Sequence, residues 1–308
     1  MEINAVFEGG GVKGISLAGA VEATERAGRT FKRVAGTSSG SIIASLLAAG
    51  YDGKEMSRII RGTSFTAFLK RAPVYNTPIV GPALRVITKK GLYSGEALES
   101  WIRGILQEKG IVTFSDLPRG KLSIIASDIT NGRILVLPDG LEEYGISSDH
   151  FEVAKAVRMS CSIPYFFDPV MLRLNGQAAK GKSFREQFVY LVDGGLLSNF
   201  PLWLFDEKKE GAKSPAGIPT VGYQMIGKAA PQPHKITGPF SMLQAMVETM
   251  LSAHDERYIE QEKFVRSVKI STLGIATTEF NITPAQSDAL YAAGQKAGED
   301  FFREWRPR

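Results

Sequence analysis

A serine flanked by glycines is the first feature of the sequence that could do chemistry. Gly36-Thr37-Ser38-Ser39-Gly40 matches the pattern Gly-x-Ser-x-Gly, in which a serine on a sharp strand-to-helix turn serves as a nucleophile. Such a turn needs small residues two before and two after the serine, and Gly36 and Gly40 fill both positions. The turn would hold the Ser38 hydroxyl at the amino end of the next helix, where unpaired N–H groups and the helix dipole favour an oxyanion. The alternative is a serine-rich helix cap whose glycines only allow close packing.

A second glycine cluster, Gly9-Gly10-Gly11-Val12-Lys13-Gly14, lies upstream and allows three interpretations. A dinucleotide site would need an acidic residue at the end of the second strand, which here ends in Val34-Ala35-Gly36. A phosphate-binding P-loop would need its lysine after the last glycine, whereas Lys13 precedes Gly14. The third interpretation is an oxyanion hole, in which glycines direct backbone N–H groups beside the nucleophile and Lys13 adds positive charge or anchors the loop. A purely structural glycine turn is the alternative.

The serine also needs a group that takes its proton, and an aspartate is the better candidate. The apolar run over 189–192 is typical of a strand and ends in Asp193, followed by Gly194 and Gly195, which allow another backbone to approach. The histidines of the chain are His150, His234 and His254. None of them ends a convincing strand that is followed by small residues. We therefore expect Asp193 to act as the general base.

Strands and helices alternate along the chain at a spacing typical of parallel βαβ units. The pattern predicts a strand over 3–8, a helix over 15–27, a strand over 31–35 and a helix over 41–49. It then predicts a helix over 96–109, strands over 121–128 and 133–137, a helix over 151–159, and strands over 170–174, 188–192 and 220–226. A long amphipathic helix over 240–263, a strand over 265–270 and a helix over 284–305 follow. Because we find no linker and no internal repeat, we expect one domain over residues 1–308.

Composition excludes several classes of protein. The chain has 308 residues, of which 44% are hydrophobic and 22% charged, as in folded soluble domains and unlike disordered or fibrous chains. A single cysteine, Cys161, cannot form an internal disulfide, and the first residues lack the layout of a secretory signal peptide. No run of 18 apolar residues is present. We therefore expect a cytoplasmic protein without a transmembrane span, and export by a route without a signal peptide stays open.

The formal net charge is +5, and the positive charge is unevenly distributed. From Met56 to Gly95 there is no acidic residue, while seven cations stand among apolar and aromatic residues: Arg58, Arg61, Lys70, Arg71, Arg85, Lys89 and Lys90. One interpretation is a surface for peripheral contact with an anionic membrane. The other is a solvated helical face together with core aromatics. No motif for nucleic-acid binding is present, so we expect no nucleic-acid partner.

Taken together, these blocks resemble the patatin-like phospholipases. The family's Gly-Gly-Gly-x-[Lys/Arg]-Gly block corresponds to Gly9–Gly14, its Gly-x-Ser-x-Gly block to Gly36–Gly40, and its Asp-Gly-[Gly/Ala] block to Asp193–Gly195. Residues 160–169 and 198–201 are similar to segments before and after the aspartate, and the resemblance covers about residues 3–205. It implies a three-layer α/β/α fold with a mainly parallel central sheet. It also implies a Ser38/Asp193 dyad in place of a triad.

The resemblance implies a serine hydrolase that cleaves carboxylic ester bonds of phospholipids or lysophospholipids, with no metal and no cofactor. The oxyanion hole would draw on the glycine loop and the elbow, that is, on Gly9, Gly10, Gly11, Lys13, Gly14 and Ser39. A soluble carboxylesterase or acyltransferase with the same dyad is the alternative within this chemistry. A non-catalytic phosphate- or nucleotide-binding protein is the alternative outside it. The family includes bacterial effectors that need a partner, so a protein activator stays open.

Overall fold

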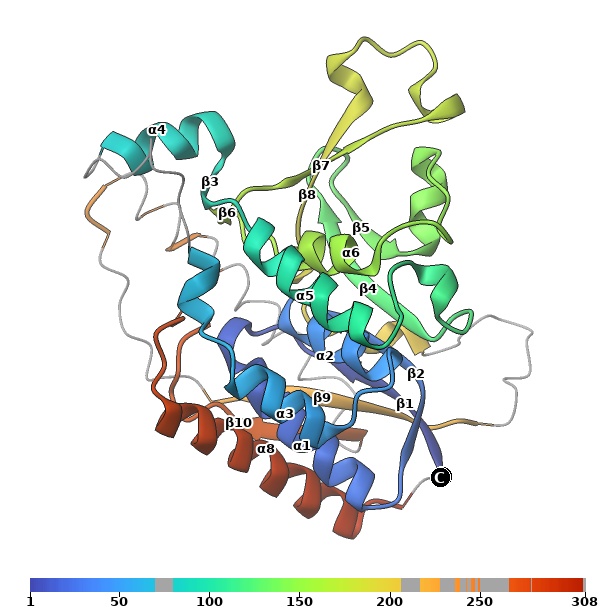
Figure 1. The fold of residues 1–308 in the computed structure, drawn as a ribbon, viewed down its shortest axis with the longest axis vertical. Coiled ribbons are helices and arrows are strands. Elements are labelled where there is room, and N and C mark those ends of the chain that lie inside the picture. The colour runs from blue at the N-terminus through green and yellow to red at the C-terminus, as the bar shows by residue number, and fades with distance from the viewer. Residues whose placement is uncertain are drawn as a thin grey trace.

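The computed structural model describes most of the chain, and Figure 1 shows its fold. The described residues are 1–69, 80–205, 217–227, 236–238, 242, 245–246, 249, 266–277 and 279–306. The helix predicted over 240–263 lies outside these ranges apart from four isolated positions, and it stays a prediction. The rest of the predicted elements can be compared with the structure.

A mixed, mainly parallel sheet forms the centre of the fold, as the sequence predicts. The strands follow one another across the sheet in the order β10 (Ser267–Ser271), β9 (Thr220–Ile226), β1 (Glu2–Phe7), β2 (Thr30–Thr37), β4 (Leu122–Asp128), β8 (Phe188–Asp193) and β7 (Val170–Arg173). Neighbours from β10 to β4 are parallel, whereas β8 and β7 are antiparallel to their neighbours. A further strand, β5 (Arg133–Leu137), pairs with β4 in antiparallel fashion. The expected α/β fold is thereby confirmed.

Helices flank the sheet (Figure 1). Their bounds are α1 (Ile15–Arg26), α2 (Ser39–Ala48), α3 (Gly53–Arg61), α4 (Val80–Lys89), α5 (Glu96–Glu108), α6 (Val153–Ser160) and α8 (Pro284–Glu304). Helices α3 and α4 were not predicted, although α3 begins at a capping box in which Asp52 and Glu55 satisfy each other's backbone N–H groups. A small second sheet pairs β3 (Gly91–Tyr93) with β6 (Tyr165–Phe167). Among the described helices, none has the combination of length and apolar character that a membrane crossing requires.

The central strands are apolar on both faces because both faces are covered. In β1, every residue from Ile3 to Phe7 is buried, and alternate side chains point to opposite sides of the sheet. Phe7 belongs to the large core cluster and stacks on Tyr223 with ring centroids 4.7 Å apart. Val6 belongs to a smaller cluster with Leu202, from the short helix Leu202–Phe205. Two packed faces hold the sheet rigid, which fixes the positions of the residues at its carboxyl edge.

Strand β4 brings two strand ends together on one of its edges. Ile124 and Ile125 pair with β2 as well as with β5, and residues 126–128 pair with β8 as well as with β5. Since a strand has only two edges, β5 occupies one, and β2 and β8 share the other. β2 runs parallel to β4 and ends at Thr37 beside Ile125, while β8 runs antiparallel and ends at Asp193 beside Ala126. The carboxyl ends of β2 and β8 therefore meet head to head.

The basic stretch from Met56 to Gly95 does not form one charged surface. Arg85 is buried and makes two hydrogen bonds to the Asp168 carboxylate, at 2.6 and 2.9 Å. Because Asp168 directly follows β6, this cation joins α4 to the second sheet. Phe68 is buried as well. Lys89 and Lys90 are exposed, whereas residues 70–79 lie outside the described part of the chain. Arg85 is thus no part of a charged surface, and membrane contact by the exposed end of α4 stays a prediction.

Helices α1 and α8 pack so closely that side chains are excluded from their contact. A Cβ atom at Gly294 would overlap the Ser16 carbonyl oxygen, and one at Gly19 would overlap the Tyr291 carbonyl oxygen. By contrast, a Cβ at Gly104 in α5 would meet nothing within 4 Å. The two helices are also joined by a buried network around Glu22, which accepts hydrogen bonds from Tyr291 and Gln295.

We expect Gly294→Ala to lower the free energy of unfolding by about 2 kcal/mol, because the added methyl group forces the two backbones apart. The control, Gly104→Ala, should raise it by about 0.5–1 kcal/mol, because alanine favours a helix more than glycine does. Urea denaturation of both variants provides the test. Stabilisation of the protein by Gly294→Ala would contradict the close packing of α1 on α8.

Candidate active site

Ser38 lies on a strained turn between β2 and α2. Its backbone angles are φ 50° and ψ −126°, values that non-glycine residues rarely adopt, and it is the N-cap residue of α2. The turn is possible because its neighbours have no side chains. A Cβ at Gly36 would overlap the backbone of Gly40, and a Cβ at Gly40 would overlap the Phe7 carbonyl oxygen. The geometry is that of a nucleophile elbow, as the glycine spacing predicts.

The head-to-head strand ends bring Ser38 and Asp193 into contact. The Ser38 hydroxyl donates a hydrogen bond to Asp193 Oδ2 at 2.7 Å, and the Gly195 N–H donates to Asp193 Oδ1 at 2.8 Å. Both side chains are buried, with exposed fractions of 6% for Ser38 and 1% for Asp193. A Cβ at Gly194 would overlap the Ile125 carbonyl oxygen, so this glycine lets the chain turn tightly against β4. The sequence-predicted pair is thus a hydrogen-bonded pair in the structure.

Burial raises the pKa of Asp193 to about 7. The hydrogen bonds from Ser38 and Gly195 act in the opposite direction, because they stabilise the carboxylate, but they do not offset the loss of solvation. An ordinary aspartate would be a weak base toward a serine hydroxyl. A carboxylate whose pKa lies near neutrality is a better match to proton transfer at physiological pH.

Two serines, one at the end of α6 and one just after it, hold both members of the pair through their backbones. The Ser38 N–H donates to Ser160 Oγ at 2.9 Å, and the Ser160 hydroxyl donates to the Ile125 carbonyl at 2.5 Å. The Asp193 N–H donates to the Ser162 carbonyl at 2.9 Å. In the sequence, residues 160–169 are similar to a segment of the family, but nothing there indicates a role for Ser160. The available signal was a small polar residue at the end of an apolar helix pattern, which by itself does not identify a partner.

The glycine loop is held against the elbow by backbone contacts. The Gly9 N–H donates to the Asn199 carbonyl at 3.1 Å, and the Asn199 amide donates to the Gly9 carbonyl at 3.2 Å. Gly11 has φ 57°, and a Cβ there would overlap the Thr277 carbonyl oxygen. Lys13 is half-buried in the short helix Gly11–Gly14, and its backbone N–H donates to the Gly10 carbonyl at 3.3 Å. A Cβ at Gly9 would lie 3.1 Å from the Ser38 Cβ, so the loop lies beside Ser38, where the sequence interpretation expects it.

The backbone donors expected near the serine are not all equally available. The Gly10 N–H donates to Ser39 Oγ at 3.0 Å, so it is already engaged within the protein. Gly14 makes this contact possible, because a Cβ there would lie only 2.8 Å from the Ser39 Cβ. Among the described residues, neither the Gly11 N–H nor the Ser39 N–H has a hydrogen-bond partner. These two N–H groups are donors of the glycine loop and the elbow that the described structure leaves unpaired.

Other candidate groups do not join the pair. His150 is exposed and shares a hydrogen bond with Ser147, whereas His234 and His254 lie outside the described residues. Cys161 is buried, and burial together with the nearby Asp193 raises the pKa of its thiol. No cluster of metal-ligating side chains occurs in the part of the chain that the structure describes.

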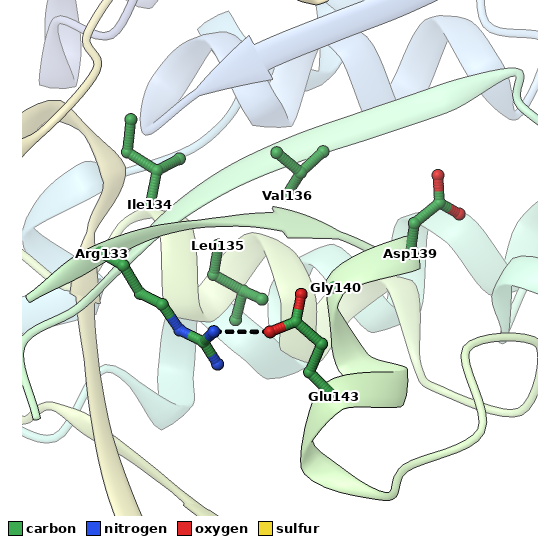
Figure 2. A pocket seen from close by; sticks show the side chains of 7 residues that line it. All are labelled: Arg133, Ile134, Leu135, Val136, Asp139, Gly140 and Glu143. Carbon is green, nitrogen blue, oxygen red and sulfur yellow. Dashed lines mark hydrogen bonds and ion pairs between the residues drawn. The ribbon is translucent and has the colours of Figure 1, made fainter. Parts of the chain in front are cut away.

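A cavity of about 290 Å³ lies at β5, away from the pair. Figure 2 shows its lining, from Arg133 to Val136 together with Asp139, Gly140 and Glu143, and the ion pair that Arg133 makes with Glu143 at 2.5 Å. Neither Ser38 nor Asp193 lines it. Its walls hold no nucleophile, so it does not extend the site.

Comparison with known proteins agrees with this geometry. The family model described as patatin-like phospholipase matches residues 5–206. The uncharacterized protein YqhO of Bacillus subtilis is 40% identical over 306 residues, which cover 99% of each chain.

Solved structures share the fold. VipD of Legionella pneumophila superimposes with a TM-score of 0.56 at 16% identity, over 98% of this chain and 66% of VipD. The type III effector ExoU, known from Pseudomonas aeruginosa, gives a TM-score of 0.52 at 17% identity, over 98% of this chain and 53% of ExoU. This chain thus spans between half and two thirds of the length of these structures. The elbow, the aspartate turn and a family match over most of the chain lead to one conclusion: the protein belongs to the patatin-like phospholipase family.

Proposed function

We propose that the protein is a lipid acyl hydrolase that cleaves carboxylic ester bonds of phospholipids or lysophospholipids. The observation that supports this most strongly is the 2.7 Å hydrogen bond from the Ser38 hydroxyl, on its strained turn, to the buried Asp193 carboxylate. Membership of the patatin-like phospholipase family supports the lipid ester as substrate. We further propose that residues 1–308 act as one unit, because β10 pairs with β9 and α8 packs on α1.

In this proposal, Ser38 Oγ attacks the ester carbonyl carbon while its proton passes to Asp193 Oδ2. The tetrahedral intermediate then collapses, the ester C–O bond breaks, and the leaving alcohol takes the proton from Asp193. Water attacks the acyl-enzyme with Asp193 again as base, which releases the fatty acid and restores the Ser38 hydroxyl. Each proton that leaves a nucleophile returns to a leaving oxygen, so Asp193 alone can serve both halves of the reaction.

The oxyanion of each intermediate would be held by backbone N–H groups. The Gly11 and Ser39 N–H groups are unpaired among the described residues, and Ser39 is the residue that follows the nucleophile. The Gly10 N–H would join them after it leaves Ser39 Oγ. Gly9, Lys13 and Gly14 would fix the loop that carries these donors. Loss of one such donor typically costs about 100- to 1000-fold in rate.

We expect Ser38→Ala and Asp193→Asn each to lower kcat/KM for ester hydrolysis at least about a thousandfold, because each removes one half of the proton transfer. His150→Ala should leave the rate within about twofold, since this exposed side chain contacts only Ser147. The measurement is release of p-nitrophenol from a soluble short-chain ester, followed by fatty-acid release from phospholipid micelles. Wild-type-like activity of folded Asp193→Asn would rule out the dyad.

The same measurement separates a phospholipase from a soluble esterase. A rate that does not increase once the phospholipid concentration exceeds its critical micelle concentration would favour the soluble esterase.

The pH dependence should report the buried carboxylate. A general base must be deprotonated, so kcat/KM should rise with pH and reach a plateau above the Asp193 pKa of about 7. Rates measured from pH 5 to 9 with a soluble ester test this expectation. A rate that is already constant at pH 5 would show that the base titrates near its ordinary value.

The Asp193 carboxyl should also make the stability of the fold depend on pH. Its folded pKa lies above the ordinary value of 3.8, so the native state keeps its proton longer than the unfolded state, and stability falls as pH rises from about 4 to about 7. Asp193→Asn removes this dependence. It should therefore raise Tm relative to wild type at pH 8 and have little effect near pH 4, as thermal unfolding would show.

Ser39→Ala tests whether the hydrogen bond to the Ser39 hydroxyl keeps the Gly10 N–H from contributing to the oxyanion hole. Removal of Oγ releases the Gly10 N–H, and because such a hydrogen bond contributes about 0.5–1.5 kcal/mol, we expect kcat to rise by about two- to tenfold. Ser39→Thr, which keeps the hydroxyl, is the matched control and should behave like wild type. A fall in kcat for Ser39→Ala alone would mean that the hydroxyl positions the loop for catalysis instead.

A further inference from the structure

The connection between β7 and β8, residues 174–187, forms an ordered projection that we call the β7–β8 arm. Its base is closed by a hydrogen bond from the Leu174 N–H to the Gln187 carbonyl at 2.7 Å. Within it, the Glu186 N–H donates to the Ser183 carbonyl at 3.0 Å. In Figure 1 the arm extends beyond the helices and the rest of the sheet at the top of the view. An internally bonded arm of this kind presents its outer side chains in a fixed arrangement.

The arm and its flanking strands combine exposed apolar side chains with an excess of positive charge. Phe184 is 68% exposed and Met171 is 57% exposed. Residues 169–192 contain one acidic residue, Glu186, and four cations, all of them exposed: Arg173, Lys180, Lys182 and Arg185. Among the ion pairs of the described residues, none involves these cations. Arg173 lies over the rings of Phe184 and Phe188, and no described carboxylate forms an ion pair with the other three cations.

Helix α4 adds side chains of the same kind near β8, the strand that follows the arm. Lys90, which follows α4, lies with its Nζ 5.1 Å from the centre of the Tyr190 ring in β8, and this contact joins the two elements. Ile87 is 73% exposed and Leu84 is 48% exposed. Lys89 is exposed as well. The exposed part of α4 thus extends the apolar and cationic character of the arm.

The arm lies on the same side of the sheet as the nucleophile. β8 runs from the arm at Phe188 to Asp193, and it is antiparallel to β4, so the arm lies beyond the carboxyl edge at which Ser38 is placed. Five strand residues, 188–192, separate its base from Asp193, and the strand from Phe188 to Asp193 spans about 17 Å. A surface that the arm contacts therefore lies on the same side of the sheet as Ser38.

We propose that the β7–β8 arm, together with the exposed part of α4, docks the protein on an anionic phospholipid bilayer. The cations face the headgroups, and Phe184 enters the boundary between headgroups and acyl chains. Exposed apolar residues rimmed by Lys and Arg are the combination that binds peripheral proteins to such interfaces. The proposal rests on the proposed function, since it explains how a lipid ester would be presented to Ser38.

The test is sedimentation of the full chain with vesicles of phosphatidylcholine alone and of phosphatidylcholine with phosphatidylserine. The wild type should bind the anionic vesicles, and high salt should weaken this binding. The triple variant Lys180→Glu, Lys182→Glu, Arg185→Glu should bind them at least about tenfold more weakly, and Phe184→Ser several-fold more weakly. The matched control is Lys54→Glu with Lys296→Glu, two exposed cations on α3 and α8, which should bind like wild type apart from a small effect of net charge.

A fluorescence measurement tests insertion directly. Phe184→Trp should give an emission shift to shorter wavelength on anionic vesicles that the wild type, with its own three tryptophans, does not show. The proposal is overturned if the wild type does not bind anionic vesicles, or if the arm variants bind as well as the control. It is also overturned if the arm variants change only the oligomeric state, which would assign the arm to a second copy of this chain.

Soluble-ester hydrolysis separates this proposal from the proposed function. The arm variants should hydrolyse a soluble short-chain ester like wild type and lose activity only on vesicles. Arm-dependent vesicle binding by a protein that hydrolyses no ester would support the docking surface and contradict the hydrolase. Equal activity of the arm variants and the wild type on anionic vesicles would overturn the docking surface and leave the dyad unaffected.

Discussion

The hydrogen bond between Ser38 and Asp193 depends on two strand ends that share one edge of β4. β2 occupies the first half of that edge and β8 the second, running the opposite way. Because both strands stop at the same level, the side chains at their ends reach a common point without support from a mobile loop. A shift of β8 by one residue would turn Asp193 to the other face of the sheet and break the contact. The register of β8 on β4 is therefore the constraint on which the site depends.

Close approach of the backbones has a second effect, on electrostatics. Gly194 packs on Ile125 and Gly40 on Phe7, and this leaves the Asp193 carboxyl without solvent. The resulting rise in its pKa makes the charged form costly to the fold, and in the proposed mechanism it suits the carboxylate to its role as a base. The strained backbone of Ser38 also lowers the stability of the fold. The two helix-packed faces of the sheet supply the stability that such a site requires.

Local signals in the sequence were enough to predict the glycine loop, the elbow and the strand that ends in Asp193. Each depends on residues close together in the chain, such as Gly36 and Gly40 around Ser38. Contacts between distant segments were not predictable. The meeting of β2 and β8, the support from Ser160 and the hydrogen bond of Gly10 to Ser39 depend on how strands pair and loops pack. The basic stretch misled for the same reason, since its charge pattern does not show that Arg85 is buried against Asp168.

In the proposed mechanism, every other step depends on the activation of Ser38 by Asp193. Fluorophosphonate labelling of purified protein, followed by intact mass and peptide mapping, tests it without any assumption about the lipid. The account predicts a single adduct on Ser38 in the wild type and none in folded Asp193→Asn. Labelling of Ser38 at the same rate in both proteins, or an adduct on a different serine, would contradict it.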